Sequence, residues 1–195
     1  MTIDAKTVKA LRDQTGAPMM DCKEALAESG GDLDKATEYL RKKGLRTADK
    51  KASRQTSEGL VGAYIHHNGL VGVLVEVDCE TDFVARGDDF KALVHDLGQH
   101  IAAANPSYLA PEDVPAEVLE KEREIIRAQI KGKPEDIVEK IVEGKLKKFY
   151  QENCLLEQPF VKDDKMTVND LVRSVIGKLG ENIKIRRFAR FDVNG

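Results

Sequence analysis

The chain has 195 residues, of which 41% are hydrophobic and 33% charged, and this suits a globular protein with one main domain and a small appended module. Its formal net charge of −3 excludes a protein that coats nucleic acid through bulk positive charge. No apolar run approaches the ~18 residues of a membrane span, no secretory leader is visible, and the cysteines (Cys22, Cys79 and Cys154) are odd in number and far apart, so we expect a reduced, cytoplasmic protein without a disulfide scaffold.

Residues 1–44 show the pattern of three short helices. The first ends at the break formed by residues 15–18, the second ends at Gly30-Gly31, and the third begins with Asp32 as its N-cap and ends at Gly44. The apolar residues that recur at helical spacing are Val8, Leu11, Met19, Cys22, Ala25, Leu26, Leu33, Ala36 and Leu40. A module of this size is near the lower limit for independent folding, so we expect it to be compact.

Residues 45–58 change in character. Arg46, Lys50, Lys51 and Arg54 lie here among small and polar residues, with almost nothing to bury. This composition predicts a solvated basic linker, with an RNA-contacting arm as the alternative.

The clearest strand signal lies in residues 59–80. Two segments of β-type composition, 60–67 and 70–79, flank Asn68-Gly69, and because this dipeptide reaches positive φ easily, it predicts a two-residue hairpin turn. The residues of the second segment that alternate onto one face are Val71, Val73, Val75, Val77 and Cys79.

A helix and a charged helical region follow the hairpin. The buried stripe of the helix consists of Phe90, Leu93, Val94, Leu97 and Ile101. Residues 106–157 hold two narrow apolar stripes on either side of a turn at Gly132-Lys133-Pro134. This arrangement predicts an antiparallel helical hairpin that projects from the core.

The chain closes with a helix and a strand. Thr167 and Asp170 resemble a capping box, and Gly180 ends the helix that they begin. The stripe expected to be buried on this helix is Leu171, Val172, Val175 and Leu179. The terminal strand is expected to place on one face Ile183, Ile185, Ala189, Phe191 and Val193.

The predicted fold class is therefore α+β. We expect a three-helix module at 1–44, the basic linker at 45–58, and a core domain at 59–195 with the helical hairpin at about 106–157. In the core domain the hairpin and the terminal strand make an antiparallel sheet of about three strands with helices on one face.

Motifs for catalysis are missing from the sequence. It holds no P-loop, no dinucleotide fingerprint, no nucleophile elbow and no H-E-x-x-H motif. His66 and His67 are adjacent on a predicted strand, so we expect their side chains on opposite faces. The acidic residues that end the strand are better explained as a solvated surface than as a cation site; they are Glu76, Asp78, Glu80 and Asp82.

Two groups of apolar residues stand where water is expected. Phe83 follows the acidic strand end, and periodicity alone favours it as a core residue, with an aromatic presented to a partner as the alternative. Met19 and Met20 are neighbours on a helix, so only one of them can face the core fully and the other offers an adaptable contact surface.

These same residues carry a resemblance to a known family. Residues 11–26 closely resemble the N-terminal signature of bacterial elongation factor Ts, and residues 79–85 (Cys-Glu-Thr-Asp-Phe-Val-Ala) resemble its second signature. The resemblance continues in order through Gln158-Pro159-Phe160-Val161 and Gly180-Glu181-Asn182-Ile183, and it covers essentially the whole chain in a short, single-core form. One departure is Pro18, where the family usually has glycine; a proline should not abolish the turn.

The resemblance implies both a fold and a function. The fold would be a ubiquitin-associated-like N-terminal module followed by a sheet domain and a helical hairpin. The function would be guanine-nucleotide exchange on elongation factor Tu, with no chemical reaction and no cofactor of its own. In that family the Thr-Asp-Phe-Val segment approaches the partner's nucleotide site, and its phenylalanine displaces the magnesium ion that bridges the phosphates.

The resemblance also implies site residues. The segment that displaces magnesium would be Thr81, Asp82, Phe83 and Val84, with Asp82 and Phe83 central. The contact positions of the N-terminal module would be Arg12, Met19 and Met20. His66 matches a core histidine less securely, because the hairpin turn differs in length.

Two other functions and an assembly state remain as hypotheses. One is an RNA-binding translation accessory that uses basic residues of 41–54 and of the terminal strand; the other is a metal-assisted hydrolase around His66, His67 and Asp82. The partners expected under the family resemblance are elongation factor Tu, in its GDP-bound and nucleotide-free states, and a second copy of the chain. The single sheet unit motivates this homodimer, with Ile183, Ile185 and Phe191 at the seam. Neither a membrane nor direct contact with nucleic acid is required.

Overall fold

The computed structural model describes residues 3–130 and 134–194, and the chain divides into two compact units. The first unit holds the described residues up to Val61 together with Glu76–Val94 and Asp170–Arg186. The second holds Gly62–Val75, His95–Asn169 and the described residues from Arg187 onward. No helix among the described residues is long and apolar enough to cross a membrane.

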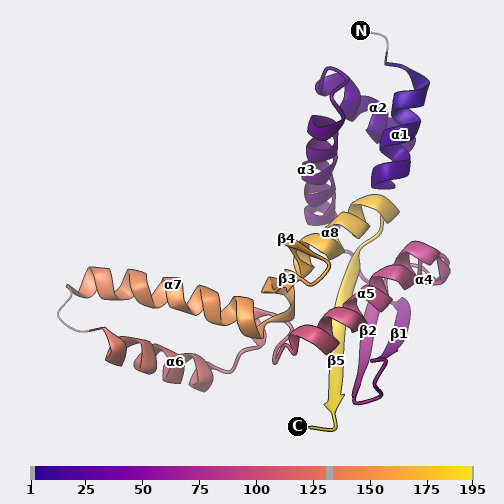
Figure 1. The fold of residues 1–195 in the computed structure, drawn as a ribbon. Helices are drawn as coiled ribbons and strands as arrows, with labels where there is room; N and C mark the ends of the chain where they lie inside the picture. Colours follow the sequence, from indigo (N-terminus) through magenta and orange to yellow (C-terminus); the bar gives the residue numbers. More distant parts are fainter. Residues whose placement is uncertain (1–2, 131–133, 195) are drawn as a thin grey trace. The chain divides into compact units, whose positions relative to one another are not determined.

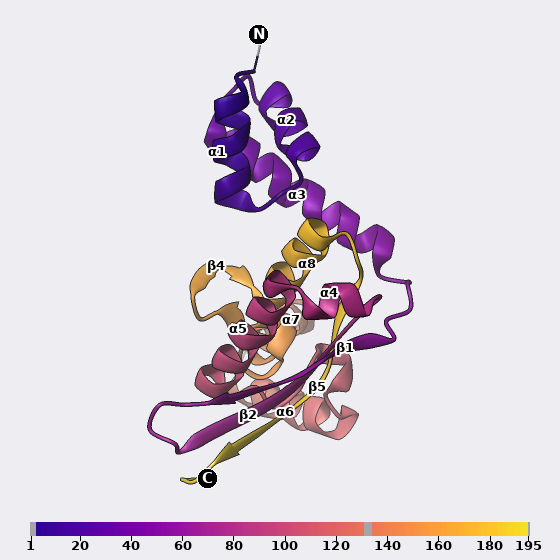
Figure 2. The same ribbon diagram turned by 90° about the vertical axis from the view of Figure 1, so that its right-hand side faces the viewer.

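The class is α+β, as predicted. The main sheet is antiparallel and has the strand order β1 (Glu58–Ile65), β2 (Val71–Cys79), β5 (Ile183–Asp192) (Figure 2). A second, small sheet pairs β3 (Pro159–Phe160) with β4 (Asp163–Thr167), in a register that sets Pro159 against Thr167. The sheet strands come from distant parts of the chain, because β5 returns to pair with β2 after the intervening helices.

The N-terminal module has the three expected helices, α1 (Ala5–Thr15), α2 (Met19–Glu28) and the first part of α3 (Leu33–Lys51) (Figure 2). The Asp32 carboxylate caps α3 by accepting the backbone N–H groups of Asp34 and Lys35, both at 3.0 Å. The core of the N-terminal module consists of Val8, Leu11, Cys22, Ala25, Leu26 and Ala36. Met19 and Leu33, which we expected on the buried face, are instead exposed.

The expected end of the third helix at Gly44 is wrong. Helix α3 continues to Lys51, so residues 45–51 of the expected linker are helical. Gly44 lies against Gly177 of α8 (Val168–Leu179), and a Cβ atom added to Gly177 would stand 2.7 Å from the Gly44 Cα atom. Gly177 therefore allows the two helices to approach closely, whereas a Cβ atom added to Gly44 would meet the Gly177 Cα atom only at 3.9 Å.

The hairpin turn also differs from expectation. The backbone N–H of Gly69 donates to the carbonyl of His66 (2.8 Å), and the N–H of His66 donates to the carbonyl of Val71 (2.8 Å). Gly69 has φ +70°, whereas Asn68 is not among the residues with positive φ. The connection is thus a longer turn with one left-handed glycine rather than a two-residue turn, since the favoured two-residue turns need positive φ at the first position, here Asn68.

The faces of β2 and of helix α5 (Asp88–Ala104) follow the predicted patterns. Val73, Val75, Val77 and Cys79 are buried, while Leu74 on the other face is exposed. The whole predicted stripe of α5 is buried: Phe90, Leu93, Val94, Leu97 and Ile101. In the second unit Gly98 of α5 lies against the Tyr64 side chain, where an added Cβ would be 2.8 Å from the Tyr64 Cβ.

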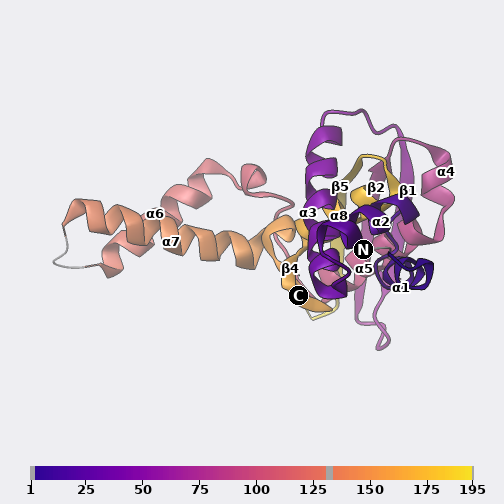
Figure 3. The ribbon, with the colours of Figure 1, turned by 90° about the horizontal axis from the view of Figure 1, so that it is seen from above.

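The predicted helical hairpin is formed by α6 (Ala116–Gln129) and α7 (Glu135–Asn153), which lie side by side (Figures 1 and 3). Ile126, Val142 and Leu146 are its buried residues. Of the predicted turn, Gly132 and Lys133 lie outside the described residues, and Pro134 precedes α7 as its N-cap. Short 3-10 turns, Pro111–Asp113 and Leu155–Glu157, flank the hairpin.

Two buried faces near the C-terminus were predicted incorrectly. On α8 the buried residues are Val168, Val172 and Ile176, so the helix is rotated from the expected stripe, of which only Val172 is buried. On β5, Ile183 and Ile185 are buried, but Phe191 is 66% exposed and Val193, just beyond the strand, is 74% exposed. The strand's apolar residues therefore divide between the interior and the surface.

A buried polar network organises the second unit. His100 is fully buried, and its Nδ1 accepts the N–H of Val161 (3.3 Å), so in the neutral ring Nε2 carries the hydrogen and donates to Gln158 Oε1 (2.9 Å). The Gln158 amide in turn donates to the carbonyls of Ala104 (3.4 Å) and Glu152 (2.8 Å). The network ties the end of α5 to the end of α7 and to β3.

This network predicts a stability that depends on pH. Burial lowers the pKa of His100 from its usual 6.5. The unfolded chain therefore takes up a proton as the pH falls through about 6.5 while the folded chain does not, so the free energy of unfolding falls on acidification below that pH. Thermal melts between pH 7.5 and 5.5 should show a smaller decrease for His100→Gln than for the unmodified chain. An unchanged slope for His100→Gln would contradict the assignment.

Candidate protein-binding site

The segment after β2 forms a short helix, α4 (Asp82–Arg86), that presents Phe83 to solvent. Thr81 is its N-cap, and the Thr81 hydroxyl accepts the backbone N–H of Val84 at 3.4 Å. Val84 and Ala85 are buried, whereas Phe83 is 85% exposed. The interpretation of Phe83 as a core residue is therefore wrong, because the two apolar residues that follow it anchor the helix.

Charges flank the exposed ring. Asp82 and Arg86 form an ion pair of 2.8 Å on one face of α4, with side-chain exposures of 58% and 79%. An ion pair this exposed contributes little to stability, so both side chains can change partners at low cost when another molecule approaches. The exposed surface of α4 therefore combines one large aromatic ring with two charged side chains that can change their ion-pair partners.

The three cysteines, including Cys79 at the base of α4, are free and buried. The Cys79 Sγ lies 3.1 Å from the carbonyl of Thr81, and burial raises the pKa of this thiol to about 11. Burial also raises the pKa of Cys154 to about 11 and that of Cys22 above its usual range. Thiols held in the neutral form are poor nucleophiles and poor metal ligands.

The N-terminal module presents a second set of predicted site residues. Arg12 lies in the last turn of α1 and Met19 and Met20 in the first turn of α2, with the turn at 16–18 between them. Arg12 is exposed, and Met19 and Met20 are 42% and 69% exposed. The expectation that one methionine would face the core is wrong, and both are available as flexible apolar contacts.

His66 lies at the start of the hairpin turn in the second unit. Its Nδ1 is 3.1 Å from the Tyr64 hydroxyl, and its ring centroid is 4.2 Å from that of His67. The two rings are thus neighbours rather than on opposite faces, because the strand ends at Ile65 and its alternation does not extend into the turn.

Among the residues that the structure describes, no group of three or more His, Cys, Asp or Glu side chains is placed to bind one metal ion. Two of the four acidic residues considered as a cation site, Glu80 and Asp82, contact other groups of the protein. Glu80 contacts Arg54 and the backbone N–H of Asn182, and Asp82 pairs with Arg86. Residues 81–84 thus present an exposed aromatic ring beside an exposed ion pair.

The fold and the site define a class: an α+β protein with a helical N-terminal module and an exposed aromatic ring on a short capped helix. A family model described as Elongation factor TS matches residues 34–194. The chain is 63% identical to elongation factor Ts of Moorella thermoacetica, over 98% of this chain and 95% of that protein. It is 57% identical to that of Fervidobacterium nodosum over 99% of each chain, and 59% identical to that of Caldanaerobacter subterraneus over 97% and 96%. The chain belongs to the elongation factor Ts family.

Sequence reasoning missed two parts of this site. Helix α4 is only five residues long and lacks a periodic stripe, although Thr81 is a typical N-cap residue and could have indicated it. Glu181, whose carboxylate contacts Thr81, is 100 residues away in the chain, and no local pattern links the two.

Proposed function

We propose that this chain is a guanine-nucleotide exchange factor for elongation factor Tu and acts in the cytoplasm during translation elongation. Membership of the elongation factor Ts family supports the partner and the process. The single observation that carries the proposal is the 85% exposure of Phe83 on a helix whose other apolar residues are buried. An exposed aromatic on a fixed turn is suited to enter a pocket of a partner, where desolvated aromatic rings dominate binding energy.

Exchange of this kind follows from differential binding. In the proposed mechanism Phe83 and Asp82 enter near the partner's nucleotide site and displace its magnesium ion. Because magnesium neutralises phosphate charge, its loss weakens the hold on GDP. Linkage then requires that bound GDP weaken the binding of this chain to elongation factor Tu by the same factor by which this chain weakens the binding of GDP.

Further contacts would hold the partner while the nucleotide leaves. Arg12, Met19 and Met20 form the proposed contact of the N-terminal module, and His66 is a proposed contact of the second unit. The proposal assigns this chain no chemical turnover and no cofactor, since exchange needs only preferential binding of the nucleotide-free partner.

The test is release of a fluorescent GDP analogue from elongation factor Tu with excess unlabelled GDP present. Micromolar concentrations of this chain should increase the release rate, in proportion to concentration until the partner is saturated, and the chain alone should hydrolyse no GTP. An unchanged release rate with a partner shown to be active would refute the proposal.

We further propose that the chain forms a homodimer, through a surface that shares only Phe191 with the seam expected from the sequence. Ile183 and Ile185 are buried in the single chain, so they are not available to a second copy. The second unit instead leaves an apolar groove on the open face of the sheet, and its exposed apolar residues are Ile65, Leu70, Leu74, Phe191 and Val193. An exposed apolar face of this kind marks an interaction site, and a two-fold axis would let it bury itself against its own copy.

The RNA-binding alternative has less support. Several of its basic side chains contact groups within the protein: Arg54 contacts Glu80, Arg41 lies 3.7 Å from Asp170, and Arg190 contacts Asp192. Phosphate contacts would compete with these ion pairs.

A further inference from the structure

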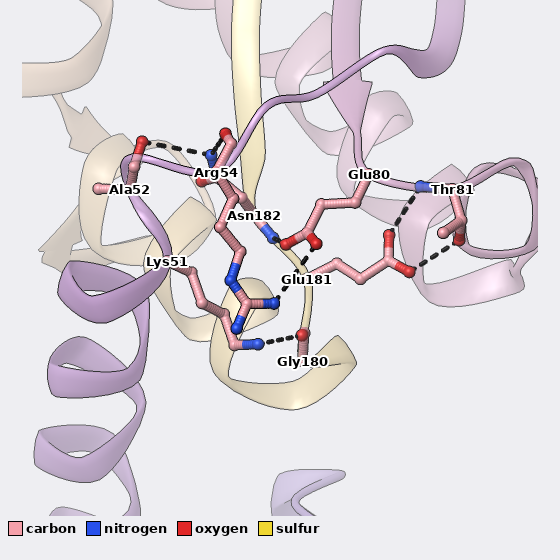
Figure 4. Close-up of polar contacts among 8 residues, drawn as sticks. All are labelled: Lys51, Ala52, Arg54, Glu80, Thr81, Gly180, Glu181 and Asn182. Atoms are coloured by element: carbon pink, nitrogen blue, oxygen red, sulfur yellow. Dashed lines mark hydrogen bonds and ion pairs between the residues drawn. The ribbon is translucent and has the colours of Figure 1, made fainter.

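Three segments that are distant in the sequence meet at the base of α4, all within the first unit (Figure 4). They are the end of α3 with the residues after it (51–54), the end of β2 (80–81), and the connection from α8 to β5 (180–182). Side chains from each segment bond to the backbone of another, so the position of α4 depends on all three.

Both carboxylate oxygens of Glu181 accept hydrogen bonds from Thr81, the N-cap residue of α4. One oxygen accepts the backbone N–H of Thr81 at 3.0 Å, and the other accepts the Thr81 hydroxyl at 2.7 Å (Figure 4). Because the hydroxyl hydrogen points to Glu181, a lone pair of the same oxygen is free to accept the N–H of Val84. Glu181 therefore fixes the rotamer through which Thr81 caps the helix.

Glu80 and Asn182 make the reciprocal contact. The backbone N–H of Asn182 donates to Glu80 Oε1 at 2.6 Å, and this bond, followed by the nearby Arg54 guanidinium, lowers the pKa of Glu80. The Asn182 side chain is 2% exposed, and its amide donates to the carbonyls of Arg54 (2.8 Å) and Ala52 (3.4 Å). Lys51 donates to the carbonyl of Gly180. The strand end and the 180–182 connection thus hold each other, and the residues after α3 hold both.

These hydrogen bonds among the three segments matter because α4 is not stable by itself. A helix of five residues is far shorter than the length at which helices are stable alone. Phe83 is mostly in water, so its own contacts do little to fix its direction. Its direction is set by the cap at Thr81 and by the burial of Val84 and Ala85, and Glu181 controls the first of these.

We propose that Glu181 is a positioning residue for nucleotide exchange: it holds Thr81, and through Thr81 it aims Phe83 at the partner. The inference depends on the proposed function of Phe83. Glu181 needs no contact with the partner or the nucleotide for this role, and its contribution passes entirely through the orientation of α4.

The test is a double-mutant cycle on GDP release from elongation factor Tu. Glu181→Ala should lower the rate at subsaturating concentration about tenfold, because two hydrogen bonds to a charged group are lost and a small misplacement of an interacting group is costly. In a Phe83→Ala background the same substitution should cause almost no further loss, since there is no ring left to aim. Glu181→Gln should lie between, because its one amide oxygen can accept only part of what the carboxylate accepts.

Controls separate positioning from stability. Glu38→Ala removes an exposed carboxylate of α3 that pairs with Lys42 at 2.7 Å, and it should leave exchange unchanged. Thr81→Val replaces the hydroxyl group by a methyl group of similar size, so it should also lower the rate of GDP release. This variant serves as the test if Glu181→Ala unfolds at too low a temperature to be assayed. A Glu181→Ala effect of equal size with and without Phe83 would overturn the inference, because it would show a direct contact or a general defect. If Phe83→Ala alone leaves exchange intact, the proposed role of Phe83 fails instead, and with it the positioning role of Glu181. If the unmodified chain causes no exchange at all, the proposed function fails.

Discussion

Phe83→Ala should lower the affinity for elongation factor Tu by about 30-fold or more while leaving the protein folded. Truncating a ring that fills a partner's pocket costs ~2 kcal/mol or more of binding free energy. In the free chain the ring is 85% exposed, so its loss should change the free energy of unfolding by only about 0.5 kcal/mol or less. Binding to the nucleotide-free partner and thermal melting measure the two effects.

Phe90→Ala is the matched control. Phe90 is fully buried on α5, so the same truncation should cost about 3–5 kcal/mol of stability through the cavity it leaves. The two variants should therefore give opposite patterns, one losing binding at an unchanged melting temperature and the other losing melting temperature. A large drop in melting temperature for Phe83→Ala would show that the ring stabilises the fold and would remove the main support for its role in exchange.

Phe191→Glu combined with Ile65→Glu should convert a dimer into a monomer. Both positions lie on the apolar sheet face, with exposures of 66% and 65% in the single chain. In a two-fold interface each substitution occurs twice, and each unpaired buried charge costs about 3–5 kcal/mol, so the dimer dissociation constant should rise by more than about 100-fold.

Light scattering over a range of concentrations measures this change. The unmodified chain should show twice the monomer mass of 21.6 kDa, and the double variant should show the monomer mass. Ile125→Glu provides the control, because Ile125 is also exposed, at 49%, but lies on α6. If the unmodified chain keeps the mass of one copy at high concentration, the homodimer proposal is wrong.

Much of the fold could be read from the sequence because it depends on neighbours along the chain. The stripe of α5, the alternation of β2 and the cap at Asp32 repeat at the spacing of a helix or a strand, or lie within one turn, so local geometry alone places them. The helical hairpin at 106–157 was predicted for the same reason, from two apolar stripes and the turn between them. The α+β class followed from these elements.

Errors arise at Gly44 and at Phe83. Gly44 is typical of a helix end, yet α3 continues through it and lies there against Gly177, which is far away in the chain. Periodicity favours Phe83 as a core residue, yet the buried positions of α4 are Val84 and Ala85. At Gly44 the local preference for a helix end is thus overruled by the tertiary structure.

The candidate site shows the same division. The sequence by itself determined the family, through the segments at 11–26 and 79–85, and with it the residues proposed to meet the partner. Only the tertiary structure decided that Phe83 faces solvent, that Glu181 holds Thr81 from 100 residues away, and that Phe191 lies on an open apolar face while Ile185 is buried. The physical reason is that exposure and hydrogen-bond partners depend on which surfaces the rest of the chain covers. Side-chain periodicity shows which residues share a face, but not which distant segment covers that face or where the cover ends.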